Sequence, residues 1–291
     1  MGAKRNNHEV ARSFLRRWRH PVPDTTDKLW ALDVRTSTIE ERSLEATFAI
    51  GRFIYVPRVN GKRDDRMEDW FGEAEQALSE FLERVDGGRL DQIDPKQHTR
   101  IVFALAGLAV RSEYEVRRLQ AAVAEREDLR SGMALATDDE DSIHLAVVDN
   151  LINHVTMIAE SLAGRTLQVA LDCDDEPLVC DRPAVYSPKL ATLLVPLGPR
   201  SFCVIDGRAQ LGPAAMTFPG RGRTAELVQQ LNRWTVERAR RWVVAATRPQ
   251  LETIRQAYTP ELLARREAAD AITVTPVSEE ERARLWSFPR A

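Results

Sequence analysis

Residues 178–200 open as Leu178-Val-Cys-Asp181-Arg-Pro183-Ala-Val-Tyr-Ser-Pro188 and continue with the strand-like segment Ala191-Thr-Leu-Leu-Val-Pro196-Leu-Gly-Pro199-Arg200. Five of the chain's fifteen prolines fall between Pro177 and Pro199. Proline fixes φ and biases the preceding residue toward extended backbone, so the loop that carries Asp181 is held in shape. A carboxylate on a stiff loop at the end of a strand is typical of active sites, and equally of structural corners.

Upstream of this loop the apolar residues recur at helical spacing. The pattern predicts a short amphipathic helix over 8–20, then a β-hairpin over 29–41, and a tight turn at Asn60-Gly61. Helices are expected over 65–85, over 94–110, and from just after the acidic stretch 138–141 to Gly164. Gly87-Gly88 ends the first, and Asp94-Pro95 opens the second with a helix cap and a proline at its first position.

Downstream of residue 164 the apolar period shortens. Strands are expected over 166–171, 177–180, 192–196, 202–205 and 242–245, with helices over 224–241 and 249–268. The fold class is therefore α+β, with an N-terminal β-hairpin, a helical middle and a small C-terminal sheet with packed helices. We expect a single domain over residues 1–270 and a polar C-terminal tail over 271–291.

The composition is that of an ordinary globular protein. The 291 residues are 43% hydrophobic and 29% charged, and the formal net charge of -3 favours neither nucleic acid nor an anionic membrane. The cysteines Cys173, Cys180 and Cys203 lack CxxC spacing, so buried free thiols are expected rather than a zinc site. No secretory signal and no apolar run of about 20 residues is visible, which predicts a cytoplasmic protein.

Several short motifs resemble those of the domain-of-unknown-function 4238 family. The family's opening motif H-x-V-P-x-x-x-L-x-x-F is similar to His8-Glu-Val-Ala11-Arg-Ser-Phe-Leu-Arg-Arg-Trp18, with alanine in place of the proline. Its hairpin resembles residues 29–41, and its glutamine-then-arginine pattern resembles Gly107 and Arg111. Its S-D-N-P, P-L-S-P-R and L-N motifs resemble Cys180-Asp181-Arg182-Pro183, Pro196-Leu-Gly-Pro-Arg200 and Leu231-Asn232.

The resemblance covers residues 8–246 and implies a protein of unassigned activity, since the family comprises bacterial, phage and fungal proteins without a known function. This chain lacks the serine and the asparagine of the S-D-N-P motif, and the glutamine position matches glycine. If the family has a catalytic centre, these departures imply that this member has lost part of it.

Four polar residues on separate predicted elements are candidates for one polar pocket: His8, Arg111, Asp181 and Asn232. Arg111 leaves an apolar helix and needs a partner, for which Asp181 is the obvious candidate. Such a pair could hold a phosphate or carboxylate, with His8 as acid or base. The alternative is that Arg111 and Asp181 brace the helical middle against the C-terminal sheet, while Asn232 caps a turn.

Two histidines and a group of arginines give weaker indications of a metal or nucleic-acid site. His144 and His154 lie on different faces of a predicted helix, so no metal and no cofactor is expected. Arg233, Arg238, Arg240 and Arg241 either contact a nucleic-acid backbone or form a solvated helix face. No Walker, Rossmann, GxSxG or HExxH motif is present.

Two function classes remain open. The first is a non-catalytic protein, or a degenerate enzyme, that binds a small or phosphate-bearing ligand in the polar pocket. The second is a nuclease-like or nucleotide-directed effector enzyme in phage–host or toxin-type conflict, using Asp181 and His8 with Arg111. The departures from the family motifs favour the first class. Whether the protein is an enzyme, and its oligomeric state, are left open by the sequence.

Overall fold

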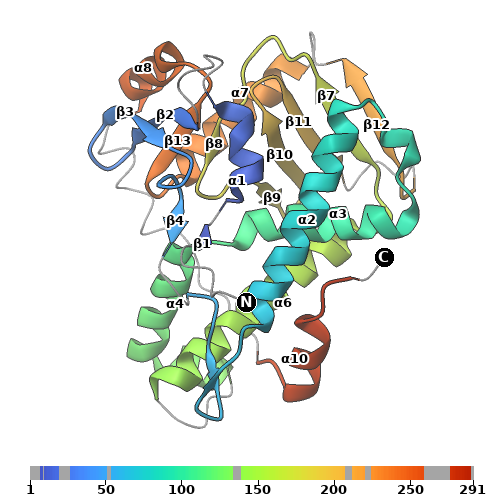
Figure 1. Cartoon of the computed structure of the whole chain (residues 1–291). Coiled ribbons are helices and arrows are strands. Elements are labelled where there is room, and N and C mark those ends of the chain that lie inside the picture. The colour runs from blue at the N-terminus through green and yellow to red at the C-terminus, as the bar shows by residue number, and fades with distance from the viewer. Residues whose placement is uncertain are drawn as a thin grey trace.

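Two β-sheets lie side by side along one edge of a helical layer (Figure 1). The computed structural model describes residues 7–8, 10–19, 27–50, 54–133, 139–206, 212–219, 224–258 and 276–289. The fold is α+β, as the sequence predicts.

The helices and 3-10 turns have the following bounds: α1 Arg12–Leu15, η1 Arg16–Trp18, α2 Arg66–Asp86, η2 Leu90–Gln92, α3 Pro95–Val110, α4 Glu113–Glu125, α5 Glu127–Gly132, α6 Glu140–Leu162, α7 Thr224–Arg238, α8 Arg248–Ala257 and α10 Glu279–Leu285. The strands are β1 Asn7–His8, β2 Lys28–Asp33, β3 Thr38–Ser43, β4 Ala49–Ile50, β5 Arg58–Val59, β6 Lys62–Arg63, β7 Leu167–Leu171, β8 Val179–Cys180, β9 Val185–Ser187, β10 Thr192–Gly198, β11 Ser201–Asp206, β12 Ala215–Pro219 and β13 Trp242–Ala245.

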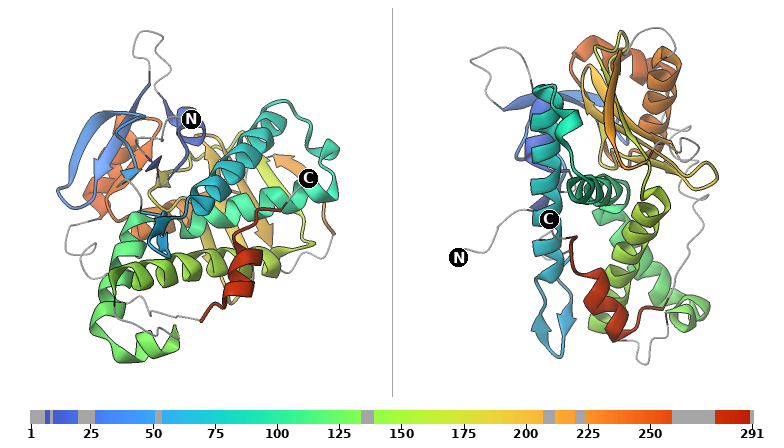
Figure 2. Two further views of the ribbon diagram at one scale, coloured as in Figure 1. Left: turned by 60° about the horizontal axis from the view of Figure 1, so that its bottom comes forward. Right: turned by 90° about the vertical axis from the view of Figure 1, so that its right-hand side faces the viewer.

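The five-stranded sheet has the order β12-β7-β11-β10-β9 and is covered on both faces. Leu193 and Val195 of β10 belong to the main core with the helical middle, whereas Leu194 packs with Leu231 of α7 on the opposite face. The right-hand view of Figure 2 shows α7 on the far side of this sheet from α2. Burial on both faces explains why β10 reads as a continuous apolar run rather than an alternating one.

The second sheet joins the N-terminal hairpin to strands from the C-terminal half of the chain, with the order β3-β2-β13-β8. The predicted hairpin is confirmed as β2 and β3, but it does not stand alone, because Trp242 of β13 pairs with Asp33 of β2. β13 also pairs with β8, which ends at Cys180. The strands expected in one C-terminal sheet are therefore divided between two sheets, and Asp181 follows the edge strand of the second.

The long helices form where the apolar spacing predicts them. The Asp94 side chain accepts a hydrogen bond from the Gln97 N–H, and Gln97 returns one to the Asp94 N–H, so α3 begins with a complete capping box. The Asn60-Gly61 turn joins β5 and β6, and both residues have positive φ. The predicted helix over 8–20 is shorter than expected: α1 and η1 end at Trp18.

The C-terminal segment packs into the helical middle. Within 276–289, Leu285, Trp286 and Phe288 are buried, and the Phe288 ring meets the Trp70 ring edge-on at 5.1 Å. Arg282 of α10 forms a bidentate ion pair with the buried Asp149 of α6, with distances of 2.7–2.8 Å. This part of the predicted polar tail therefore contributes to the core, while the predicted domain boundary stays a prediction.

Candidate functional site

The four residues predicted to form one pocket make contacts in separate places. Arg111 follows α3, Asp181 follows β8, and Asn232 lies on α7. His8 lies in β1, where it pairs with Ala49 of β4; its side chain is outside the described part of the chain. The structure gives Arg111, Asp181 and Asn232 different partners, so the pocket as predicted does not form from their mutual contacts.

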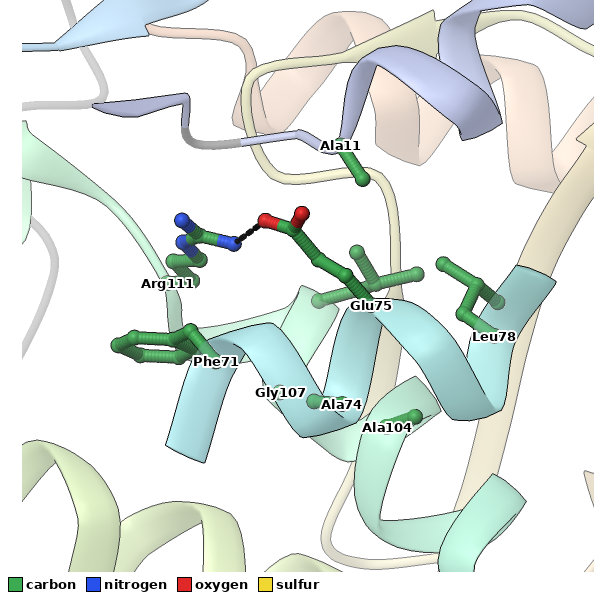
Figure 3. A pocket seen from close by; sticks show the side chains of 9 residues that line it. Ala11, Phe71, Ala74, Glu75, Leu78, Ala104, Gly107 and Arg111 are labelled. Atoms are coloured by element: carbon green, nitrogen blue, oxygen red, sulfur yellow. Dashed lines mark hydrogen bonds and ion pairs between the residues drawn. The ribbon is translucent and has the colours of Figure 1, made fainter. Parts of the chain in front are cut away.

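Arg111 pairs with Glu75, not with Asp181. Its Nη1 donates a hydrogen bond of 2.6 Å to Oε1 of Glu75, which projects from α2 (Figure 3). The guanidinium also lies 4.4 Å from the centre of the Phe71 ring and 5.7 Å from that of Tyr55. The predicted Arg111–Asp181 ion pair is therefore wrong, because a carboxylate on the neighbouring helix lies closer to the end of α3.

A small cavity borders this pair, and it is lined by two of the residues that depart from the family pattern, Ala11 and Gly107 (Figure 3). Its volume is about 10 Å³, which is room for roughly one water molecule. A phosphate group does not fit into this space. The surroundings of Arg111 are therefore a structural junction between α1, α2 and α3.

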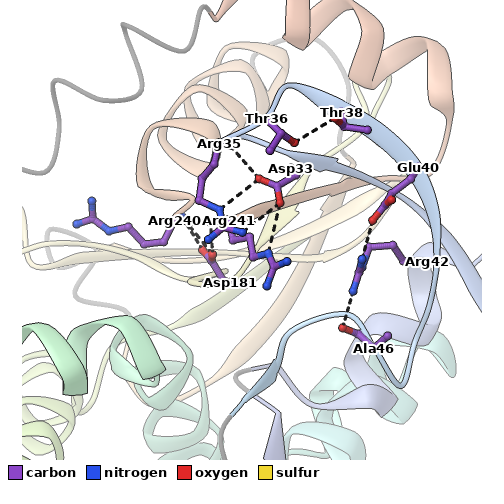
Figure 4. A network of polar contacts seen from close by, with 10 residues as sticks. All are labelled: Asp33, Arg35, Thr36, Thr38, Glu40, Arg42, Ala46, Asp181, Arg240 and Arg241. Carbon is purple, nitrogen blue, oxygen red and sulfur yellow. Dashed lines mark hydrogen bonds and ion pairs between the residues drawn. The ribbon is translucent and has the colours of Figure 1, made fainter.

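Asp181 binds backbone amides. The Arg240 N–H donates to both carboxylate oxygens at 3.1 Å, and the Arg241 N–H donates to Oδ2 at 2.7 Å (Figure 4). The carboxylate is buried, with 3% of the residue exposed. Burial raises its pKa, while the amide hydrogen bonds and the charge of Arg182 act in the opposite direction. Asp181 thus ties the end of β8 to the connection between α7 and β13, as the bracing alternative predicts.

The same connection is tied to the hairpin through Asp33. Nε of Arg241 donates to Oδ2 of Asp33 at 3.3 Å (Figure 4). The Val34 N–H donates to the Arg241 carbonyl at 2.8 Å. Burial would raise the pKa of Asp33, but hydrogen bonds from Arg35 and Arg241 hold it below its usual value. Two buried carboxylates thus hold the segment 240–241 between two strands.

Asn232 fixes a loop rather than facing Asp181. Its Oδ1 accepts from the Leu178 N–H at 2.8 Å, and its Nδ2 donates to the Glu176 carbonyl at 2.9 Å. It therefore caps the loop before β8, and it also lines a surface pocket between α7 and α8.

Three arginines from distant segments meet one carboxylate, and we call Arg118, Arg182 and Arg240 around Glu115 the arginine cluster. Nη1 of Arg182 lies 2.8 Å and Nη2 of Arg240 3.6 Å from Oε1 of Glu115, while Nη2 of Arg118 lies 2.9 Å from Oε2. The Arg240 guanidinium also lies 4.5 Å from the centre of the Tyr114 ring. The side chain of Arg240 points away from Asp181 in Figure 4.

The side chains of the arginine cluster are largely buried, and they lie near His154. The side chains of Arg182 and Arg240 are 16% and 11% exposed, and that of Arg118 is 23% exposed. The pKa of the neighbouring His154 is lowered by desolvation and by the charges of Arg182 and Arg238, against the opposing effect of Glu115. Arg182 and Arg238 therefore act on His154 in the direction opposite to Glu115.

Sequence reasoning missed this cluster. Arg240 was expected either at a nucleic-acid backbone or on a solvated helix face, and no role was expected for Glu115, Arg118 or Arg182. One feature of the sequence could have indicated it. Arg182 stands between Asp181 and Pro183, so its backbone is held by the proline-fixed turn and its side chain leaves that turn in a defined direction.

Residues 6–165 match the family described as Protein of unknown function (DUF4238). The chain belongs to this family. The match includes the opening motif and Arg111, but the motifs around Asp181, Arg200 and Asn232 lie beyond it. No curated protein and no solved structure matches the chain.

The arginine cluster lies across the limit of the DUF4238 match. Glu115, Arg118 and His154 are inside residues 6–165, whereas Arg182 and Arg240 are outside. The helical middle of the family therefore supplies the carboxylate and one arginine, and the C-terminal sheets of this chain supply the other two.

The described residues also bear on membrane-spanning segments, metal sites and thiols. None of their helices combines the length and the apolar character that crossing a bilayer requires. No set of three or more His, Cys, Asp or Glu side chains in the same residues is arranged to hold a metal ion. The three cysteines are free and buried, as expected.

Proposed function

We propose that this DUF4238 protein is a cytoplasmic, non-catalytic binding protein whose arginine cluster holds a small phosphate-bearing ligand. The observation that supports the proposal is the meeting of three guanidinium groups at the single carboxylate of Glu115. The arginine guanidinium is planar and carries donors that match two phosphate oxygens, so a group of arginines is the usual means of binding a phosphate.

A buried donor of the arginine cluster supports an anionic ligand. Nε of Arg182 is buried without a hydrogen-bond partner in the described part of the chain. Buried donors without partners are costly, and an anion that reaches them recovers that cost. Arg118 is the most exposed arginine of the cluster, so it gives solvent a path to the cluster.

The non-catalytic interpretation follows from Asp181. The carboxylate that the sequence marks as a candidate catalytic group already accepts hydrogen bonds from two backbone amides. A carboxylate occupied in this way serves poorly as a base or as a nucleophile. The alternative of a nuclease-like or nucleotide-directed effector has no separate observation in its favour.

Titration calorimetry with phosphate, pyrophosphate and ATP at fixed ionic strength tests the proposal. We expect binding of at least one of them by the wild type and a large loss of affinity in Arg182→Gln. The control is Arg117→Gln. Arg117 lies on α4, the helix of Glu115 and Arg118, but its side chain is exposed and pairs with Glu113. Equal affinity in the wild type and in folded Arg182→Gln would remove the arginine cluster as the site. Hydrolysis of ATP, or of a nucleic-acid substrate, by the wild type would favour the alternative.

A further inference from the structure

A second, larger pocket lies on the surface between α7 and α8, closed on one side by the loop 174–178. Its volume is about 420 Å³, within the range of pockets that hold small molecules. Its apolar lining includes Leu178, Val236 and Ile254, which belong to one buried cluster. An aliphatic chain of a ligand can therefore lie against a surface that is already packed from behind.

The loop that forms the acidic wall of this pocket is held in place by two helices. The Glu176 carbonyl accepts hydrogen bonds from Nδ2 of Asn232 at 2.9 Å and from Nε2 of Gln250 at 2.7 Å. The Trp18 indole N–H donates to the neighbouring Pro177 carbonyl at 3.2 Å. The wall is thus organised before any ligand arrives, which lowers the entropic cost of binding.

Three consecutive carboxylates, Asp174, Asp175 and Glu176, line this wall. Asp175 accepts a hydrogen bond from Gln229 at 3.2 Å, and neither Asp174 nor Glu176 forms an ion pair with a described residue. Arg233 also lines the pocket, but its charge is balanced by Glu237 at 3.0 Å. The pocket therefore carries an excess of negative charge above an apolar floor.

The arrangement of the oxygen acceptors in this pocket favours an organic cation over a metal ion. The carboxylates of the described residues do not converge in a set of three that could hold a metal ion. Oε1 of Gln250, another lining residue, is buried and has no hydrogen-bond partner within the described ranges. An ammonium group has several N–H donors, and these can reach separate acceptors on the wall.

We infer that this pocket binds a small aliphatic amine, with its alkyl stem against Leu178, Val236 and Ile254 and its ammonium group at the carboxylates of the wall. Asn232, which the sequence singles out, then acts as a positioning residue that holds the wall through its backbone. This site is separate from the arginine cluster and takes a ligand of opposite charge.

Titration calorimetry with 1,6-diaminohexane and spermidine tests the inference, with 1-hexanol and hexanoate as probes of the same stem without the positive charge. We expect the amines to bind, and the two control ligands to bind at least about tenfold more weakly, since they lack the charge-assisted hydrogen bonds. Affinity should also fall as salt is raised, because the carboxylates are partly exposed. Equal affinity for hexanol, or no binding of either amine, would overturn the inference.

Three variants locate the site. The double variant Asp174→Asn/Glu176→Gln should weaken amine binding by about tenfold or more. Thr253→Trp should block the pocket, since Thr253 is an exposed lining residue of α8 and the change leaves the core intact. Asp172→Asn is the matched control, because Asp172 is exposed, does not line the pocket and has a positive φ that asparagine tolerates.

The controls separate this inference from the proposed phosphate site. Thermal unfolding of each variant establishes that it is folded, and Arg182→Gln should retain amine binding. If the double variant and Thr253→Trp are folded and bind amines as the wild type does, the pocket is not the amine site.

Discussion

The guanidinium of Arg182 lies 2.8 Å from the carboxylate of Glu115, which stands 67 residues earlier in the chain. This contact joins the turn after β8 to the first turn of α4, and Glu115 also receives Arg118 and Arg240. Glu115 is thus a partner that the three arginines share.

Replacing Glu115 by glutamine should have opposite effects on stability and on binding. Without the carboxylate the three arginines repel one another, so the free energy of unfolding should fall by about 1–3 kcal/mol. If the cluster binds phosphate, the same change should tighten binding, and added phosphate should restore part of the lost stability. Urea unfolding with and without phosphate measures both effects.

The matched control for this change is Glu113→Gln. Glu113 lies two residues before Glu115 on α4 and pairs with the exposed Arg117. Its loss should change the free energy of unfolding by no more than about 0.5 kcal/mol. Phosphate affinity that is unchanged or weaker in Glu115→Gln would contradict an anion site at this position.

The fold was largely predictable because its long helices and its hairpin are specified locally. The capping residues Asp94 and Pro95 and the Asn60-Gly61 turn occur where the sequence places them. Helix α4 was missed, since its two buried apolar residues, Val116 and Val123, are too few to give a clear period.

Contacts between distant segments were not predictable from local pattern. The pairing of Trp242 with Asp33 divides the C-terminal strands between two sheets, and no local signal encodes that choice. The candidate site shows the same limit. Arg111 was correctly expected to need a partner, but the packing of α2 on α3 places Glu75 next to it. Residue types thus indicated which groups needed partners, and tertiary packing decided which partners they received.

Asp181→Asn should destabilise the protein without creating a cavity. Asparagine keeps one acceptor oxygen but turns an N–H₂ group toward the amides of Arg240 and Arg241, which need an acceptor. We expect a loss of about 1–3 kcal/mol in the free energy of unfolding. Chemical denaturation measures it, with the exposed Asp172→Asn as control. A stability equal to that of the wild type would show that the amide contacts contribute nothing.

Arg111 and Glu75 should be coupled in a double-mutant cycle. Arg111→Ala removes a buried side chain together with its aromatic contacts, so we expect a loss of about 2–4 kcal/mol. Glu75→Gln should cost less, about 0.5–1.5 kcal/mol, since the Glu75 side chain is 35% exposed and water screens the pair. Denaturant unfolding of both single variants and the double variant gives the coupling. Additive losses would mean that the ion pair itself does not brace α2 and α3.

Phe288→Ala should show that the C-terminal segment belongs to the folded core. Phe288 is 5% exposed and packs against Trp70 and Phe103, so its truncation should cost about 2–4 kcal/mol. Ser287→Ala is the adjacent exposed control and should lie within about 0.5 kcal/mol of the wild type. Equal unfolding midpoints for the wild type and Phe288→Ala would support an independent tail beyond residue 270.

His98 should make stability depend on pH. Its ring is buried, with 1% of the residue exposed, and Nε2 lies 2.7 Å from the Arg165 carbonyl oxygen. Desolvation lowers the pKa of His98 in the folded state, against the opposing effect of that carbonyl. The unfolded chain therefore takes up a proton below about pH 6.5 while the folded chain does not, so the free energy of unfolding must fall as the pH drops from 6.5 toward the lowered pKa.

The variant His98→Gln separates this titration from the hydrogen bond. The glutamine Nε2 can still donate to the Arg165 carbonyl, but it does not titrate. The comparison is made in a His154→Gln background, because the pKa of His154 is lowered as well. Urea unfolding between pH 5.5 and 7.5 should then give a shallower dependence in His98→Gln than in the background protein. Parallel curves would mean that His98 is protonated equally in the folded and unfolded states, and that the Arg165 carbonyl compensates fully for its burial.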